Sequence, residues 1–363
     1  MVTIAVDAMG GDSAPKSIVE GAAEASLISD SEIVLVGDEV IITQLLQAVR
    51  HDPSRIRIHG AQGAIPMDAK PKEALESWPN ASLPTAARLV AAPGGPDALV
   101  SAGNTGAVIL ACAQAFRCLD GVKRTALAAV IPTEQRRGEK DDPFTLLLDA
   151  GATVRVTSRD LAAFGLMGAA YASIVSRNQR PRVALLSNGT EPNKGTEEII
   201  GAHAFLRNVP GIDFIGNIEG IDIPRGTADV IICDGFTGNI TLKMLEGVSE
   251  TVMNLARYAY RSKFSWKVAM WLLSSGIKTI KDLTDWQQYG GAPILGFDRL
   301  CIKAHGRSGP RAIRNAIKVA ERCVKQDLVG RIRTGLATLM AESTADVLAA
   351  DPEARAAIAA ARK

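Results

Sequence analysis

"TIAVDAMGGDSAP", residues 3–15, places a buried strand directly before a loop with very small side chains. The strand covers Thr3–Val6, and a helix-like spacing of apolar residues begins again at Ile18. Between the strand and the helix lie Asp7, Gly10, Gly11, Asp12 and Pro15. A strand, a glycine-rich turn and a helix form the repeating unit of a parallel α/β sheet, and the glycines predict that the backbone passes close to a ligand.

Short apolar runs alternate with longer helix-like segments along most of the chain. The runs read "TIAVDA", "EIVLVG", "RIRIHG", "DALVSAG", "TALAAVIP", "FTLLLDAG", "RVALLSNG", "DFIGNIEG", "ADVIICDG" and "LCIKAHG". This alternation predicts an α/β fold with a Rossmann-like, mostly parallel sheet and flanking helices. We expect one α/β domain over residues 1–340, an amphipathic helical protrusion at 258–283 within it, and a helical tail at 341–363.

The composition argues against several classes of protein. A formal net charge of +2 and an aromatic content of 4% do not favour nucleic-acid binding. The five cysteines form no CxxC pair and have no histidine cluster beside them, so we expect neither a disulfide framework nor a metal site. No apolar run reaches the roughly 18 residues that predict a membrane span, and the N-terminus lacks a signal-peptide pattern. We therefore expect a cytoplasmic protein.

Further turns repeat the order of strand, glycine-containing loop and helix. They lie in "ALVSAGNTGAVILAC", "VALLSNGTEPNKGTEEI" and "VIICDGFTGNITLKML". The first turn contains Ser101, Gly103, Asn104, Thr105 and Gly106. Backbone N–H groups at the start of a helix bind anions, and the carboxyl ends of neighbouring parallel strands face one crevice. Neither a G-x-G-x-x-G motif nor a P-loop motif is present, so the predicted anion site is not one of these nucleotide-binding loops.

Charged and polar side chains lie in these turns, where packing does not require them. Asp7 and Asp12 flank the first two glycines, and the other candidates are Lys194, Asp234, Asn239, Lys243, Lys303 and His305. A helix cap or a surface ion pair is the alternative role for a single aspartate or lysine, and His305 is equally open to a catalytic or a structural role. No G-x-S-x-G motif or Cys–His pairing indicates a covalent nucleophile. The pattern favours chemistry on a positioned anion.

Two helical segments have amphipathic patterns that allow more than one interpretation. At 258–283 basic residues surround an apolar stripe that contains Trp266, Met270, Leu273 and Ile277. This stripe fits either a subunit interface or a helix on a membrane surface. At 309–328 one helix face is basic, with Arg311, Arg314, Lys318, Arg322 and Lys325. That face is either a docking surface for an acidic protein or an ordinary solvated surface.

Several blocks of the sequence resemble, in order, those of the bacterial phosphate acyltransferase family, which acts on acyl carrier protein and phosphate. The blocks are "IAVDAMGGDSAP", "VSAGNTGA", "GNIEG", "DGFTGNITLKMLEG" and "YGGAPILG…IKAHG". The resemblance implies a homodimer with an isocitrate- or isopropylmalate-dehydrogenase-like fold. It implies transfer of a long-chain acyl group from acyl carrier protein to inorganic phosphate with no cofactor and no metal. It also implies attachment to the inner face of the membrane and a downstream glycerol-3-phosphate acyltransferase.

With this reaction in view, the candidate residues receive roles. The predicted catalytic set is Lys194, Asp234, Asn239, Lys243 and His305. We expect Lys194 or Lys243 to neutralise phosphate, and His305 or Asn239 to donate a hydrogen bond to the thioester oxygen. The predicted substrate contacts are Asp7, Gly10, Gly11, Asp12, Ser101, Gly103, Asn104, Thr105, Gly106 and Lys303. The predicted contacts to the carrier protein are Arg311, Arg314, Lys318 and Arg322.

The sequence also departs from the pattern of the family. The tract from Glu76 to Leu83 lacks the usual basic residues, and Thr153, Ser187 and Asn188 replace the residues expected at their positions. These departures concern substrate contacts and not the fold. Two alternatives stay open at this point: a nucleotide-linked α/β enzyme of the same architecture, and a non-catalytic scaffold associated with the membrane.

Overall fold

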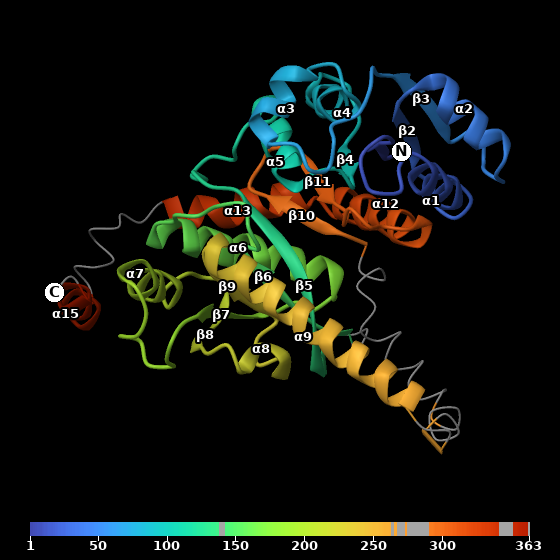
Figure 1. Cartoon of the computed structure of the whole chain (residues 1–363). Helices are drawn as coiled ribbons and strands as arrows, with labels where there is room; N and C mark the ends of the chain where they lie inside the picture. The colour runs from blue at the N-terminus through green and yellow to red at the C-terminus, as the bar shows by residue number, and fades with distance from the viewer. Residues whose placement is uncertain (138–141, 263–264, 267–272, 274–289, 341–350, 362–363) are drawn as a thin grey trace.

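The computed structural model places the described residues in one sheet that has helices on both faces (Figure 1). It describes all residues except 138–141, 263–264, 267–272, 274–289, 341–350 and 362–363. The sheet has 11 strands in the order β3-β2-β1-β4-β11-β10-β5-β6-β9-β7-β8. Antiparallel pairing occurs between β10 and β11, β10 and β5, and β5 and β6. The predicted α/β fold with a mostly parallel sheet is therefore confirmed.

Parallel strands from the N-terminal part of the chain build one side of the sheet. These strands are β1 (Thr3–Asp7), β2 (Glu32–Gly37), β3 (Ile56–Gly60) and β4 (Ala98–Ser101), and β11 (Leu300–Lys303) joins them. The helices of this part are α1 (Lys16–Ser26), α2 (Glu39–Gln47), α3 (Pro71–Ser77), α4 (Ser82–Ala91), α5 (Thr105–Ala115) and α12 (Pro310–Lys325). Helices cover both faces, so β4 is buried at every position and its sequence is apolar without alternation.

The middle of the chain and elements from its C-terminal part build the other side of the sheet. Its strands are β5 (Ala126–Arg137), β6 (Asp142–Leu148), β7 (Arg182–Leu186), β8 (Asp213–Ile218), β9 (Val230–Ile232) and β10 (Ala292–Leu295). The helices are α6 (Ser158–Val175), α7 (Glu197–Leu206), α8 (Asp222–Arg225), α9 (Gly235–Ser262), α13 (Leu328–Met340) and α15 (Pro352–Ala361). The helix α6 is buried along most of its length, because it packs on β6 and β9 and also contacts α12 and α13.

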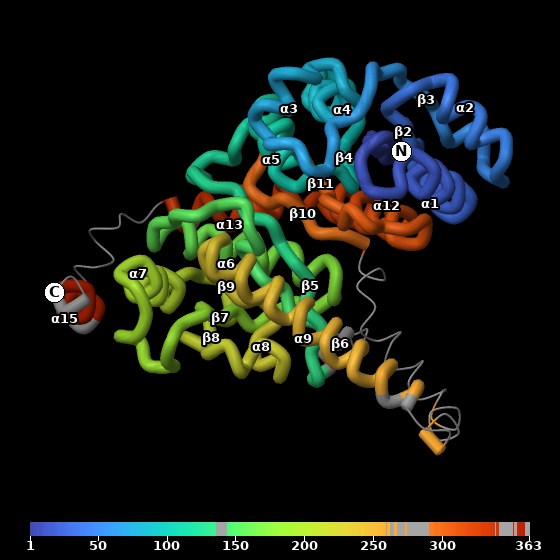
Figure 2. Tube along the Cα trace, in the orientation of Figure 1, coloured from blue at the N-terminus to red at the C-terminus, as the bar shows by residue number. Residues whose placement is uncertain are grey.

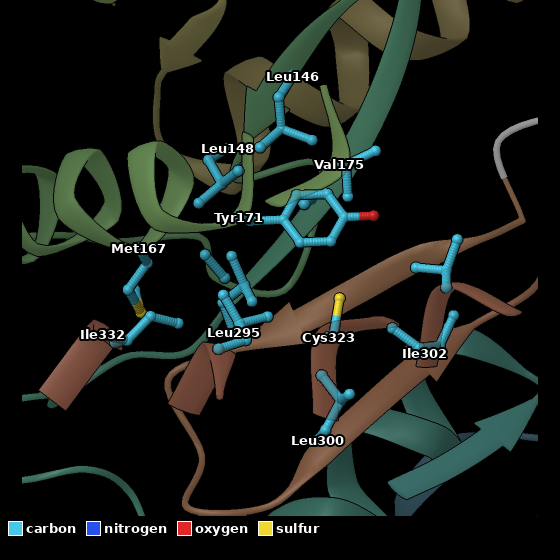
Figure 3. Close-up of a cluster of buried hydrophobic side chains, with 14 of the residues drawn as sticks. Leu146, Leu148, Met167, Tyr171, Val175, Leu295, Leu300, Ile302, Cys323 and Ile332 are labelled. Atoms are coloured by element: carbon cyan, nitrogen blue, oxygen red, sulfur yellow. The ribbon is translucent and has the colours of Figure 1, made fainter. Parts of the chain in front are cut away.

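Tyr171 of α6 lies where the two sides of the sheet meet. Figure 3 shows its ring among apolar side chains from both sides, including Leu148 of β6 and Ile302 of β11. Cys323 of α12 lies below the same ring, and all four side chains are buried. Burial raises the pKa of the Tyr171 hydroxyl well above its usual value, so this group stays neutral. The two sides of the sheet therefore share one apolar core.

The helix α9 begins inside the body and extends away from it, as the gold helix in Figure 1 and Figure 2 shows. Its 28 residues leave a row of large apolar side chains exposed. We call this row the α9 stripe; it consists of Phe236, Ile240, Met244, Val248, Val252, Leu255 and Tyr258. Apolar exposure along this part of the chain therefore begins well before the segment 258–283 in which the sequence predicts a protrusion.

The segment 258–283 is described only in part. Trp266 and Leu273 of its predicted apolar stripe are 50% and 61% exposed. The other two, Met270 and Ile277, lie outside the described residues. Among the helices of the described ranges, none combines the length and the apolar character that crossing a bilayer requires.

Two glycines of α9 offer a matched pair of substitutions. A Cβ atom at Gly238 would overlap the carbonyl oxygen of Asp149, whereas a Cβ atom at Gly247 would meet nothing within 4 Å. We expect Gly238→Ala to lower the free energy of unfolding by about 3 kcal/mol, because α9 must shift away from that backbone. Gly247→Ala should raise it by up to about 1 kcal/mol, because alanine is the better helix former. Urea denaturation measures both, and equal shifts would contradict this packing.

Candidate active site

Neighbouring strands end in polar residues at one edge of the sheet. The last residue of β1 is Asp7, that of β4 is Ser101, and that of β11 is Lys303. β4 pairs in parallel with both of the other strands, and its register places Ser101 beside Lys303. Because parallel strands have their carboxyl ends at the same edge, these side chains lie together where α/β proteins commonly bind ligands.

The carboxylate of Asp7 is buried and accepts a hydroxyl hydrogen bond on each oxygen. Ser82 Oγ donates to Oδ1 at 2.6 Å, and Ser101 Oγ donates to Oδ2 at 2.7 Å. Burial raises the pKa of Asp7, and the hydrogen bonds oppose that shift without cancelling it. Asp7 thus joins the end of β1 to the start of α4 and the end of β4. No motif around Ser82 predicts this contact, and sequence analysis missed it.

The two glycines after this carboxylate are required by contacts between loops. A Cβ atom at Gly10 would overlap the Asp7 carboxylate and would touch the backbone of Gly103, and Gly11 has a φ of +127°. The backbone N–H group of Asp12, the next residue, donates to the carbonyl of Gly306 at 2.8 Å. The glycines are therefore required by contacts between the protein's own loops, and the predicted close approach to a ligand stays a prediction.

Lys303 is 6% exposed, which is rare for a lysine. Its Nζ donates to the carbonyl of Ala304. Burial lowers the pKa of Lys303 to about 8, while the thiol of Cys301 and the carboxylates of Asp7 and Asp12 oppose the shift. Lys303 therefore exchanges its proton much closer to neutral pH than an exposed lysine does.

His305 is held in a defined neutral form. The backbone N–H of Arg307 donates to its Nδ1 at 3.2 Å. Burial lowers the pKa of His305, and the positive charges of Lys303 and Arg307 act in the same direction. A neutral imidazole that accepts a hydrogen bond at Nδ1 carries its proton on Nε2. His305 therefore provides an N–H donor at this edge of the sheet.

The helix α9 brings a second part of the chain to this cluster. Lys243 forms an ion pair with Glu246 at 2.7 Å, and the charges of both residues influence the pKa of His305. Asn239, one turn earlier, donates to the carbonyl of Ala150 at 3.4 Å. Lys243 and His305, two members of the predicted catalytic set, therefore lie near each other, and Asn239 is on the same helix as Lys243.

Asp149 supports the turn against which α9 packs, and sequence analysis missed it. Its carboxylate accepts the N–H groups of Leu127, Gly151, Ala152 and Thr153 at 2.7 to 3.1 Å. Burial raises the pKa of this carboxyl against the effect of these bonds. "LLLDAG" repeats the order of "IAVDAMG", in which a strand leads to aspartate, alanine and then glycine. That repeat is the signal that points to Asp149.

The turn before α5 uses its polar side chain within the protein. Asn104 caps the helix by accepting the N–H of Ala107 at 3.0 Å, and its amide donates to the carbonyl of Met67 at 2.8 Å. Within the described residues, the N–H groups of Thr105 and Gly106 have no acceptor. These two N–H groups keep the anion-binding capacity that the sequence predicted for the whole turn.

Two members of the predicted catalytic set have local contacts. Asp234 caps α9, because its carboxylate accepts the N–H of Thr237 at 2.9 Å and the hydroxyl of the same residue at 2.6 Å. Lys194 lies in the loop after β7, where its side chain covers Gly189 and its N–H donates to the carbonyl of Glu191 at 3.1 Å. The contacts described for Lys194 stay within this loop, so they do not join it to His305.

The basic helix predicted near the C-terminus is α12, and its apolar face is buried. Ion pairs neutralise part of the opposite face: Arg314 pairs with Glu24 at 3.0 Å, and Lys325 pairs with Glu321 at 2.7 Å. Lys318, between these pairs along the helix, is exposed. The basic face therefore exists but has less net charge than the sequence pattern indicates.

The candidate site is a cluster of side chains at the carboxyl ends of β1, β4 and β11. Two cavities, of about 510 Å³ between α7 and α15 and about 440 Å³ beside the start of α13, share no lining residue with the cluster of Asp7, Lys303 and His305. In the described part of the chain, no group of three or more histidine, cysteine, aspartate or glutamate side chains is arranged to hold a metal ion.

Comparison with known sequences identifies close relatives along nearly the whole chain. The model of a family described as "Fatty acid synthesis protein" matches residues 2–331. A protein of Dictyoglomus turgidum named phosphate acyltransferase is 39% identical over 334 residues, which cover 92% of this chain and 97% of the relative. A phosphate acyltransferase of Moorella thermoacetica is 42% identical over 326 residues, which cover 90% of this chain and 93% of the relative.

Comparison with solved structures supports the fold. A phosphotransacetylase from Streptococcus pyogenes superposes with a TM-score of 0.57 at 15% identity, covering 90% of this chain and 94% of the other. A branched-chain phosphotransacylase from Enterococcus faecalis gives a TM-score of 0.52 at 14% identity, with 89% and 99% covered. At such low identity, the likeness extends to the arrangement of strands and helices and no further.

Proposed function

This chain belongs to the phosphate acyltransferase family, and from that premise we propose that it transfers a long-chain acyl group from acyl carrier protein to inorganic phosphate. The products are acyl phosphate and the free thiol of the carrier. The observation that carries this proposal is the cluster of Lys243, Lys303 and His305 beside the carboxyl ends of β1, β4 and β11. Positive charges and N–H donors at this place suit a small dianion and a carbonyl oxygen.

In the proposed reaction, phosphate lies between Lys243 and the N-terminus of α5. The N–H groups of Thr105 and Gly106 and the positive end of the helix dipole attract the anion. A phosphate oxygen attacks the thioester carbonyl, and the Nε2–H of His305 stabilises the negative charge that develops on the carbonyl oxygen. The new C–O bond forms as the C–S bond breaks, and the carrier leaves as a thiolate.

The first prediction concerns the reaction and its residues. Wild-type protein with acylated carrier protein should release free thiol only when phosphate is present, and mass spectrometry should detect acyl phosphate. Lys243→Ala and His305→Ala should each lower turnover about 100-fold, because each removes a preorganised charge or donor. Lys194→Ala tests whether the loop after β7 also takes part. Lys123→Ala, at an exposed position outside the cluster, is the control.

The outcomes separate the reaction from the site. If wild-type protein releases no thiol in response to phosphate, the proposed reaction is wrong. If the reaction occurs but Lys194→Ala, Lys243→Ala and His305→Ala all keep near-normal turnover, the reaction stands and the site assignment is wrong.

We further propose that the basic face of α12 docks the carrier protein. Acyl carrier proteins are strongly acidic, and Lys318 is exposed on this face between the partly neutralised Arg314 and Lys325. Attraction between such surfaces increases the rate of encounter and weakens as salt screens the charges.

The charge-reversal variant Arg314→Glu/Lys318→Glu tests this surface. We expect it to raise the KM for acylated carrier protein several-fold at low salt and to leave the KM for phosphate unchanged, because only the encounter with the carrier is affected. The difference from wild type should shrink at high salt. Lys123→Glu is the control. An unchanged KM for the carrier in Arg314→Glu/Lys318→Glu would place the docking surface elsewhere.

We also propose that α9 serves assembly and membrane attachment. At about 100° per residue the α9 stripe occupies one side of the helix, while Lys243, Glu246, Glu250 and Arg257 fall on the other. Such a stripe on a helix that leaves the body fits pairing with the same helix of a second copy, which gives a homodimer. The exposed Trp266 and Leu273 beyond it fit contact with the inner membrane surface, where acyl phosphate would pass to glycerol-3-phosphate acyltransferase for phospholipid synthesis.

Two double variants distinguish the parts of this segment. Val248→Glu/Leu255→Glu should convert the dimer into a monomer in light scattering, because charges would be buried between the paired helices. Trp266→Glu/Leu273→Glu should stay dimeric but should lose most of its flotation with anionic vesicles, because its apolar contact with the bilayer is removed. If Trp266→Glu/Leu273→Glu becomes monomeric, or floats as well as wild type, the segment at 258–283 belongs to the subunit interface.

A further inference from the structure

We propose that Lys303 is the general acid of this reaction and protonates the carrier thiolate as the C–S bond breaks. The inference rests on the proposed function. It gives a catalytic role to Lys303, which the sequence predicted only as a substrate contact. Lys303 ends β11, two residues before the proposed oxyanion donor His305. The leaving sulfur and the carbonyl oxygen are bonded to the same carbon atom, so their two proton donors must come from neighbouring positions in the protein.

The contacts of Lys303 leave its ammonium group available for such a role. A buried lysine commonly neutralises a buried carboxylate through an ion pair. In the described part of the chain, however, Lys303 forms no ion pair, and the two oxygens of Asp7 accept hydrogen bonds from Ser82 and Ser101. The ammonium donates to the carbonyl of Ala304, and this single bond leaves its other N–H groups for substrate.

Burial, modified by neighbouring charges, lowers the pKa values of both Lys303 and His305. The charges that affect the pKa of Lys303 are those of Asp7 from β1, Asp12 from the following loop and Cys301 on its own strand, and the charge of Lys303 lowers the pKa of His305. Burial lowers the pKa of Lys303 to about 8, close to the value of about 8.5 for an ordinary thiol, so proton transfer to the leaving sulfur is nearly balanced. His305 is neutral at the same pH. Two adjacent groups with separated pKa values are the usual arrangement for divided acid and base roles.

The step balances without a further reactant. Hydrogen phosphate attacks through one oxygen, the acyl C–O bond forms, and the electron pair of the C–S bond moves to sulfur. Lys303 gives a proton to that thiolate and becomes a neutral amine. The proton that hydrogen phosphate carried is more acidic once the phosphate is acylated, and it returns to the amine directly or through water. The net products are acyl phosphate, the free carrier thiol and the protonated lysine.

The decisive variants are Lys303→Arg and Lys303→Met, compared with wild type from about pH 6 to about pH 9.5. An acid must be protonated to act, so wild-type turnover with the carrier thioester should fall as the pH rises through about 8. Arginine keeps the positive charge but does not release its proton. The turnover of Lys303→Arg should therefore be about 100-fold lower than that of wild type, and it should no longer decrease near pH 8. Its KM for phosphate should change less than about threefold.

A second substrate tests the same step in a different way. Thiophenol is much more acidic than an alkyl thiol, so its thiolate leaves without a proton donor. Either Lys303 variant should therefore lower turnover of the acyl thioester of thiophenol less than about tenfold. Lys123→Met is the control, and thermal unfolding monitors the stability of both Lys303 variants.

Each result has a definite meaning. The proposal would be overturned if Lys303→Arg turned over the carrier thioester as fast as wild type does. It would also be overturned if the variants lost the same factor in turnover with both thioesters, because Lys303 would then act only as a fixed charge. If Lys303→Met fails to fold, Lys303→Arg and the wild-type pH profile decide the question. Absence of phosphate-dependent thiol release in wild type would instead disprove the reaction itself.

Discussion

The buried carboxylate of Asp7 is the contact on which the candidate site depends. A carboxylate without access to water is unfavourable unless hydrogen bonds compensate, and hydroxyl groups from α4 and β4 supply them. The same geometry leaves no room for a side chain at Gly10 and brings the following loop onto Gly306. Lys303 is buried at the same edge, and burial lowers its pKa although the carboxylates of Asp7 and Asp12 oppose the shift. Asp7 thus determines the shape of this edge, whereas burial of Lys303 lowers the pKa of its ammonium group against the charge of Asp7.

The other side of the sheet uses a comparable arrangement for a different purpose. Asp149 also follows a buried strand, but its carboxylate collects backbone N–H groups from the turn that comes after it. That turn supports the start of α9, where Gly238 packs on the carbonyl of Asp149. The two aspartates therefore have separate tasks: Asp7 joins loops around the reactive cluster, and Asp149 determines where α9 leaves the sheet. In both, burial outweighs the hydrogen bonds and raises the pKa of the carboxyl group.

Because α9 is a continuous helix, it couples the site to the outer surface of the protein. The charge of Lys243 influences the pKa of His305, and Asn239, one turn earlier, donates to the carbonyl of Ala150, while the α9 stripe is exposed. If a continuous helix shifts where it packs on the body, its far end moves as well. In the proposed function, the reaction would proceed near the start of α9, and assembly and membrane contact would take place along its length and beyond it.

The sequence by itself determined the fold class, because apolar runs without alternation require a sheet that is covered on both faces. It also indicated the turns around Asp7, Ser101 and Lys303, because the carboxyl ends of parallel strands meet whatever the order of the strands. It did not reveal Ser82, which reaches Asp7 only because α4 packs beside β1, or the local contacts of Lys194 and Asp234. Local patterns record which residues lie in a turn, but the partner of each polar group depends on packing between segments far apart in the chain. Only the tertiary structure decided which lysine is buried and which carboxylates surround it, and therefore which proton is available for chemistry.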